Sequence, residues 1–90
     1  MISKTVKVGA DSAVEARTLA MIVQIAGKYE SAIRIECGGR SMNAKSIMGV
    51  LSLGIKEGES IYVLATGRDE KRAIHALEEL VGSGFAEEEE

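Results

Sequence analysis

Few residues of this 90-residue chain are of the types that catalyse reactions or bind metals. It has one histidine, His75, and one cysteine, Cys37, and no Cys/His cluster. A single cysteine excludes an internal disulfide, and without a cluster we expect no metal site. His75 lies among charged residues of an expected helix, so we interpret it as a surface residue. Cys37 is interpreted as a small apolar residue on a strand, without chemistry. These residues give no indication of a cofactor or of an enzyme, and we expect neither.

Two polar residues, Glu15 and Ser46, are placed where helices are expected to begin. An acidic residue there interacts favourably with the exposed N–H groups and the positive end of the helix dipole, typically by ~0.3–1 kcal/mol. A serine hydroxyl there accepts a hydrogen bond from an early backbone N–H. Helix capping is therefore a sufficient explanation for both residues, and it needs no partner.

Three apolar residues follow Ser46 on the same short helix: Ile47, Met48 and Leu51. One interpretation is that one or two of them belong to the core. The other is that they form an exposed apolar group, which would be a reasonable surface for docking a partner. Arg17, at another helix start, is either a solvated arginine or a group that pairs with a carboxylate or phosphate.

Alternation of apolar and polar side chains predicts β-strands at residues 2–8, 31–37 and 59–66. Gly38-Gly39 is typical of a tight turn, so a hairpin should lead into a fourth strand at 40–43. Lys4 is the exception to this alternation, because it is a charged residue on the otherwise apolar face of the first strand. The residues expected on the inner faces are Ile2, Val6, Val8, Ile33, Ile35, Cys37, Ile61, Val63 and Ala65.

Apolar spacing of three and four residues predicts helices at residues 16–26, at 46–53 and after Asp69. Gly27 and Gly54 lie where the first two helices should end, and Asp69 should cap the third. The buried stripes are expected at Leu19, Val23 and Ala26, flanked by Ile22, and at Ala73, Leu77, Leu80 and Val81.

The element order β-α-β-β-α-β-α predicts an α+β fold: an open-faced sandwich of two layers, with three helices on one face of a four-stranded, mainly antiparallel sheet. Ninety residues allow one domain, which we place at residues 1–86. Residues 87–90 are all glutamate and should form a disordered acidic tail. A turn is expected at residues 9–12.

Composition narrows the classes of function. The net charge of −3 argues against general nucleic-acid binding, and the three aromatic residues provide no stacking pairs for RNA. No apolar run approaches the roughly 20 residues of a membrane span, and the amino terminus does not resemble a signal peptide. We therefore expect a cytoplasmic protein without direct nucleic-acid or membrane partners.

The segment NAKSIMGVLSLG at residues 43–54 closely resembles the regulatory-site segment of HPr phosphocarrier proteins from Gram-positive bacteria. The opening KTVKV at 4–8, the Ala16-Arg17 pair and the Val23-Gln24 pair also match, in register and without gaps. The resemblance covers nearly the whole chain and implies an HPr-like fold.

The family's phosphoacceptor histidine, within a His-Ala-Arg-Pro-Ala motif, is missing, since residues 15–19 read EARTL. The resemblance thus implies a protein that is not competent as a histidine phosphocarrier. Glu15 would be either a helix cap or a permanent, imperfect mimic of phosphohistidine, with one negative charge. The family's Crh subgroup carries glutamine there and acts only in regulation, and some Crh-type relatives form dimers, so a homodimer stays open.

The resemblance also implies that Ser46 is the serine phosphorylated by HPr kinase/phosphorylase. Ile47, Met48, Leu51 and Arg17 would then contact protein partners, among them a LacI-type catabolite control repressor. Two alternatives remain: a phosphotransferase-system phosphocarrier that uses Glu15 or another non-histidine site, and an accessory binding domain with an unrelated partner.

Overall fold

The structure, a computed structural model, describes residues 1–9 and 16–82. Its elements follow the order β-α-β-β-α-β-α, which confirms the predicted order. They are β1 (Ile2–Lys7), α1 (Ala16–Ala26), β2 (Ala32–Cys37), β3 (Arg40–Asn43), α2 (Ile47–Ser52), β4 (Ser60–Thr66) and α3 (Glu70–Gly82). The expected turn at 9–12, apart from Gly9, lies outside the described residues, as do Glu15 and the acidic tail at 87–90.

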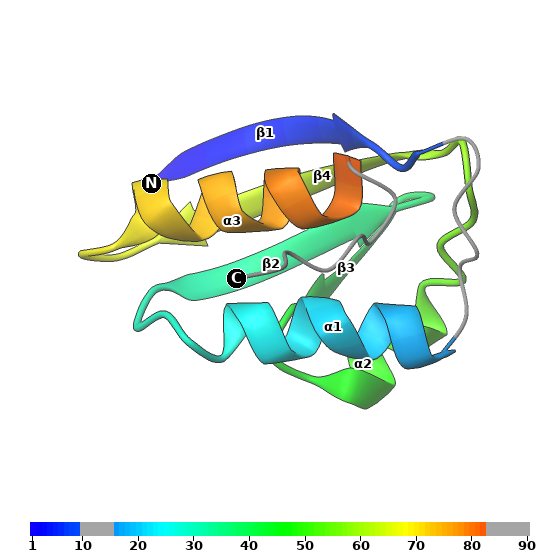
Figure 1. Ribbon diagram of the computed structural model, residues 1–90, viewed down its shortest axis with the longest axis horizontal. Coiled ribbons are helices and arrows are strands. Elements are labelled where there is room, and N and C mark those ends of the chain that lie inside the picture. Colours follow the sequence, from blue (N-terminus) through cyan, green and yellow to red (C-terminus); the bar gives the residue numbers. More distant parts are fainter. Residues whose placement is uncertain (10–15, 83–90) are drawn as a thin grey trace, which may run out of the picture.

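The four strands form one antiparallel sheet in the order β1-β4-β2-β3, as Figure 1 shows. β4 is central and pairs with both β1 and β2, so Ala65 lies opposite Ile2 on one side and Ile33 on the other. Side chains opposite each other point to the same face of a sheet. This register therefore gathers the apolar residues of the three strands on one face.

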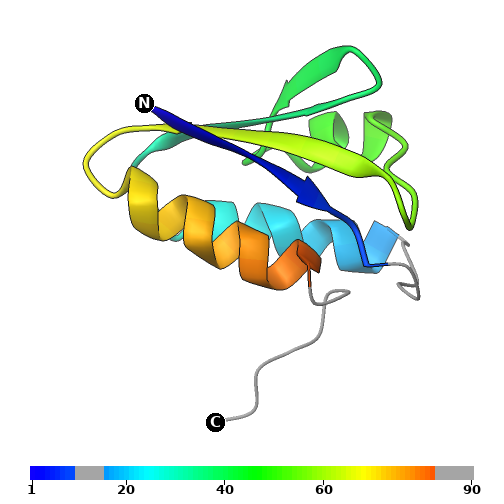
Figure 2. The same cartoon turned by 90° about the horizontal axis from the view of Figure 1, so that it is seen from above.

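The helices form the second layer, and Figure 2 shows α1 and α3 together beneath the sheet. α3 packs against β1 and β4, while α1 packs against α3 and α2. The short α2 also contacts the edge strand β3. The opposite face of the sheet carries mostly polar and charged residues, together with Tyr62 and Leu64, and none of the described helices covers it, which gives the expected open-faced sandwich.

The core between the layers is almost wholly aliphatic, which agrees with the low aromatic content. Ile22, Ile33, Ile35, Ile61 and Leu77 are its largest fully buried side chains. All of the expected α3 stripe is buried, and Ile74 joins it. In α1 the expected stripe is shifted: Ile22 is fully buried, whereas Val23 is only partly buried against the core.

Gly38 and Gly39 join β2 to β3 with φ angles of 60° and 80°. Two successive positive φ angles define the type I′ turn, whose twist matches that of a two-stranded ribbon. The predicted hairpin is therefore confirmed, and the pairing of Cys37 with Arg40 follows directly from it. Arg40 is thereby fixed at the first position of β3.

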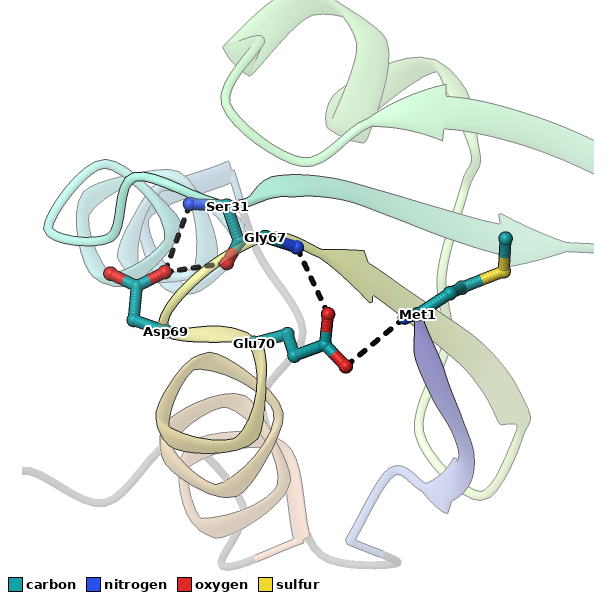
Figure 3. Close-up of polar contacts among 5 residues, drawn as sticks. All are labelled: Met1, Ser31, Gly67, Asp69 and Glu70. Atoms are coloured by element: carbon teal, nitrogen blue, oxygen red, sulfur yellow. Dashed lines mark hydrogen bonds and ion pairs between the residues drawn. The ribbon is translucent and has the colours of Figure 1, made fainter.

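The turn between β4 and α3 contradicts one prediction. Asp69 does precede α3, and its carbonyl accepts the hydrogen bond of Ala73 N–H, but its carboxylate does not act as the expected cap. Figure 3 shows it turned toward the loop before β2, where Asp69 accepts from Ser31 N–H (2.9 Å) and from the Ser31 hydroxyl. It also accepts from Glu30 N–H (2.9 Å). Ser31 lies 38 residues before Asp69 in the sequence. Rules based on neighbouring residues could not include this contact, so they predicted that the Asp69 carboxylate caps α3.

These contacts lower the pKa of the Asp69 carboxyl to about 2, chiefly through the Ser31 hydroxyl and then the Glu30 N–H. The neighbouring Glu70 accepts from Gly67 N–H (3.0 Å) and pairs with the amino group of Met1 (3.1 Å), which lowers its pKa as well. We call Ser31, Gly67, Asp69 and Glu70 the β4–α3 corner.

Candidate functional site

The turn that leads into α2 is organised by Asn43. Its side-chain Oδ1 accepts from Lys45 N–H (2.9 Å) and its carbonyl accepts from Ser46 N–H (3.0 Å). Ala44 between them is fully buried, and its N–H donates to the carbonyl of Ile33 (2.9 Å). The turn is therefore anchored to the sheet, and Ser46 is held at a defined place where α2 begins.

Ser46 caps α2, as its position predicts. Its backbone is extended (φ −105°, ψ 115°), its Oγ accepts from Gly49 N–H (3.2 Å), and its carbonyl accepts from Val50 N–H (3.0 Å). This is the geometry of a serine N-cap. The side chain is partly exposed, so the same oxygen that caps the helix can be reached from solvent.

Two further contacts hold this six-residue helix, which is too short to be stable alone. Val50 is fully buried and fixes the middle of α2 against the core. Arg40 donates from Nη1 to the carbonyl of Ser52 (2.6 Å) at the carboxyl end, where a cation also meets the helix dipole favourably. Sequence reasoning missed Arg40, because nothing local links it to a residue twelve positions later.

The apolar residues of α2 divide between solvent and core. Met48 is 73% exposed and Ile47 38% exposed, whereas Leu51 is half-buried and packs against the core. Among the described residues, the exposed large apolar side chains are Met1, Ile47, Met48 and Tyr62. Two of these four lie beside Ser46, and we call Ser46, Ile47, Met48 and Leu51 the α2 surface.

Basic residues lie on the elements around the α2 surface. Arg17 is exposed in the first turn of α1, which packs against α2. Lys45 directly precedes Ser46, and its Nζ donates to the carbonyl of Tyr29 (2.7 Å). The positive charges of Arg17 and Lys45 would favour an anion at Ser46, as would the first-turn N–H groups of α2. The position of Glu15 relative to these groups lies outside the described residues.

The remaining candidates for chemistry are placed as structural or surface residues. The His75 side chain is 73% exposed and lies 3.6 Å from Glu79. Cys37 is buried, and burial together with the Glu59 carboxylate raises the pKa of its thiol, which keeps it protonated. Across residues 1–9 and 16–82, no cluster of acidic, histidine or cysteine side chains could hold a metal ion, and no helix could cross a membrane.

These features define a class of protein: a small open-faced α+β sandwich that presents a capping serine beside exposed apolar side chains.

Comparison with known proteins finds relatives of this class. A family model described as "PTS HPr component phosphorylation site" matches residues 2–83. The HPr-like protein Crh of Halalkalibacterium halodurans is 43% identical over 77 residues, which cover 86% of this chain and 92% of that protein.

Solved structures of the same family share the fold. The crystal structure of HPr-C-His from Thermoanaerobacter tengcongensis is similar with a TM-score of 0.88 and 40% identity, covering 99% of this chain and all of that one. Crh from Bacillus subtilis, described as a dimer with a swapped domain, has a TM-score of 0.73 and 33% identity, covering 97% of this chain and all of that one.

The chain belongs to the HPr family of the phosphotransferase system, and it resembles the catabolite-repression protein Crh within that family. Members of the family are phosphocarrier or regulatory proteins. The predicted resemblance and fold are therefore confirmed.

Proposed function

We propose that this protein is a regulatory member of the HPr family, phosphorylated at Ser46 by an HPr kinase/phosphorylase, and that it acts by binding a protein partner. The observation that carries the proposal is the placement of Ser46. Its Oγ is held 3.2 Å from Gly49 N–H at the start of α2, and Met48, two residues later, is 73% exposed. A phosphate at this position would meet backbone donors and a positive helix end, so it need not unfold α2.

The missing histidine supports a regulatory role over phosphate transfer. Position 15 is glutamate, and the chain's only histidine, His75, is on the exposed face of α3 beside Glu79. A phosphocarrier needs a nucleophile that takes up phosphate and releases it readily, which a neutral imidazole does well. We expect no phosphate uptake from phosphoenolpyruvate through enzyme I, whether residue 15 is glutamate or, in Glu15→Ala, alanine.

The proposed partner of the phosphorylated form is a LacI-type catabolite control repressor. Phosphorylation adds about two negative charges next to the apolar pair Ile47 and Met48. Such a surface suits a partner that offers basic side chains around an apolar pocket. Arg17 would pair with a carboxylate of the partner at the edge of this surface. The ATP-dependent kinase step implies a cytoplasmic protein.

The first test is intact mass after incubation with ATP, Mg²⁺ and an HPr kinase/phosphorylase. We expect a gain of one phosphate that Ser46→Ala abolishes and that Ser52→Ala, on the same helix, does not. Failure of the unmodified protein to gain phosphate would contradict the proposal. A gain that persists in Ser46→Ala would move the modification to another residue and contradict the assignment of Ser46.

The second test compares two residues of equal exposure. Ile47 is 38% exposed on α2, and Tyr62 is 39% exposed on the open face of the sheet. In a binding titration of the phosphorylated protein with the repressor, Ile47→Ser should weaken binding by about tenfold or more, whereas Tyr62→Ser should not. Equal effects would mean that α2 is not the docking surface.

A homodimer is a further partner to test, because the described Crh of B. subtilis is a dimer. In this chain β1 and β3 are the edge strands of the sheet, each paired with a single neighbour, so an edge strand is the element available for exchange. Sedimentation over a range of protein concentrations would show a dimer directly. A single monomer-sized species at all concentrations would exclude it.

A further inference from the structure

The four methionines of the chain divide sharply by exposure. Met1 and Met48 are 76% and 73% exposed, whereas Met21 and Met42 are partly buried and pack against the core. Oxidation of a methionine thioether requires access of the oxidant to sulfur. We therefore expect two fast-reacting methionines, at the amino terminus and on α2, and two that react slowly.

Met48 differs from Met1 in its neighbourhood. Met48 is the second residue of α2 and directly follows Ile47, two positions after Ser46. Met1 directly precedes β1, and its amino group pairs with Glu70 at the β4–α3 corner, as Figure 3 shows. Of the two exposed methionines, only Met48 belongs to the α2 surface.

We propose that Met48 is a site of reversible oxidation that switches off docking at the α2 surface; this inference rests on the proposed function. In the reaction with hydrogen peroxide, a lone pair of the Met48 sulfur attacks one peroxide oxygen and the O–O bond breaks. The sulfur is oxidised by two electrons to the sulfoxide, and the peroxide is reduced to water. The product replaces a flexible apolar side chain with a polar, chiral one.

The change affects docking more than folding. Because Met48 is mostly solvent-exposed and Val50 is the residue that anchors α2, the sulfoxide removes little packing within the protein. In a complex the same oxygen would enter an apolar contact and would need a hydrogen-bond partner there, which costs binding free energy. The regulatory consequence is that phosphorylation at Ser46 and oxidation at Met48 act in opposite directions on one surface.

The experiment uses the full chain, phosphorylated at Ser46 first so that the kinase step is not affected. Peroxide is added, and peptide mass mapping follows each methionine and Cys37 with time. Met48→Leu, in which Met1 is the one remaining fast-reacting methionine, is the control for oxidation at Met1, and binding to the repressor is titrated before and after oxidation. Met48→Leu is compared only with itself, before and after the same treatment.

We expect Met48 to oxidise together with Met1 and well before Met21 and Met42. Repressor binding by the phosphorylated protein should weaken by about tenfold or more on oxidation and recover with a methionine sulfoxide reductase. Binding by Met48→Leu should not change with peroxide. The thermal unfolding curve of the oxidised protein should stay close to that of the untreated one, which separates loss of docking from loss of fold.

Two results would overturn the inference alone. One is oxidation of Met48 no faster than that of Met21 and Met42, and the other is unchanged binding after complete conversion of Met48. If the untreated phosphorylated protein does not bind the repressor, the proposed function itself is wrong and the inference fails with it. The untreated titration therefore distinguishes the two failures.

Discussion

Ser31 and Ser46 lie in similar places in the sequence, each just before a secondary-structure element, yet the fold treats them in opposite ways. Ser31 is 1% exposed, and both its N–H and its hydroxyl donate to the Asp69 carboxylate. Ser46 is partly exposed, and its Oγ accepts from Gly49 N–H, a bond that leaves the hydroxyl proton uncommitted.

The difference shows how one residue type serves two purposes in a small domain. At the β4–α3 corner, carboxylates join segments that are distant in the sequence, and the serine is closed off from solvent. At the α2 surface, buried Val50 holds the inner face of the helix against the core and Arg40 holds its carboxyl end, so the outer face can stay exposed. The first region joins distant segments of the fold, and the second leaves Ser46 and Met48 accessible to solvent.

The largest effect should come from Gly67→Ala at the β4–α3 corner. Gly67 has φ of 152°, and a Cβ added there would lie 2.6 Å from Ser31 Oγ and 2.7 Å from Ser31 Cα. Backbone strain and overpacking should together lower the free energy of unfolding by about 2–4 kcal/mol. Urea denaturation measures this loss. Gly58→Ala, at φ of 80° with open space around it, isolates the cost of strain, and an equal loss there would show that the close contact with Ser31 is unimportant.

The next largest effect should appear in acid. The pKa of Asp69 is about 2 in the folded protein, below its usual 3.8. A group with a lowered folded pKa stabilises the fold above its unfolded pKa and loses that contribution as pH falls toward the folded pKa. The free energy of unfolding should therefore fall between about pH 4 and pH 2.

Asp69→Asn should flatten this fall without abolishing it, because the pKa of Glu70 is also lowered. Denaturation curves recorded at several pH values test the point. If the variant and the unmodified protein lose stability in parallel below pH 4, Asp69 does not carry the dependence. Ser46→Ala, at the other region, should leave the slope unchanged.

A smaller effect is expected at the α2 surface. Ser46→Ala removes the cap on α2 and should lower the free energy of unfolding by about 1 kcal/mol. Ser46→Asp should retain most of the stability, because a carboxylate also caps a helix and interacts with its dipole. Thermal and urea unfolding of both variants would measure the contribution of the cap to stability without any phosphate. Equal stability of Ser46→Ala, Ser46→Asp and the unmodified protein would show that Ser46 has no structural role.

The smallest effect should follow Arg40→Ala, which removes the hydrogen bond to the Ser52 carbonyl. We expect a loss of about 0.3–1 kcal/mol, seen best as faster amide exchange at the carboxyl end of α2. Arg40→Lys keeps the charge and should restore part of the protection. Unchanged exchange in Arg40→Ala would mean that Val50 and the Ser46 cap suffice to hold the helix.

How far the sequence predicts this molecule depends on the range of the interactions involved. Alternation and helical spacing are local patterns, and they predicted every strand and helix to within about two residues. Gly38-Gly39 determined the hairpin because the turn type depends on those residues alone. Ser46 as a cap was predictable for the same reason.

Contacts between distant segments were not predictable in this way. Asp69 was expected to cap α3 because a local rule favours it there, whereas Ser31 competes for it from 38 residues away. Arg40 and Ser52 meet only because the hairpin and α2 pack together. Whether Ile22 or Val23 faces the core depends on the rotation of α1 against its neighbours, which spacing defines only to within one residue.

The pairing of β1 with β4 has a consequence for how the chain is made. Ser3 and Tyr62, whose hydroxyl groups are 2.7 Å apart in the folded protein, are separated by 59 residues in the sequence. At a synthesis rate of about 5–20 residues per second, β1 waits roughly 3–12 s for its partner strand. During that time β2 and β3 can already close their two-glycine hairpin. The first strand synthesised is thus among the last to join the sheet, and its two lysines, Lys4 and Lys7, which lie on opposite faces of the strand, help to keep it soluble until then.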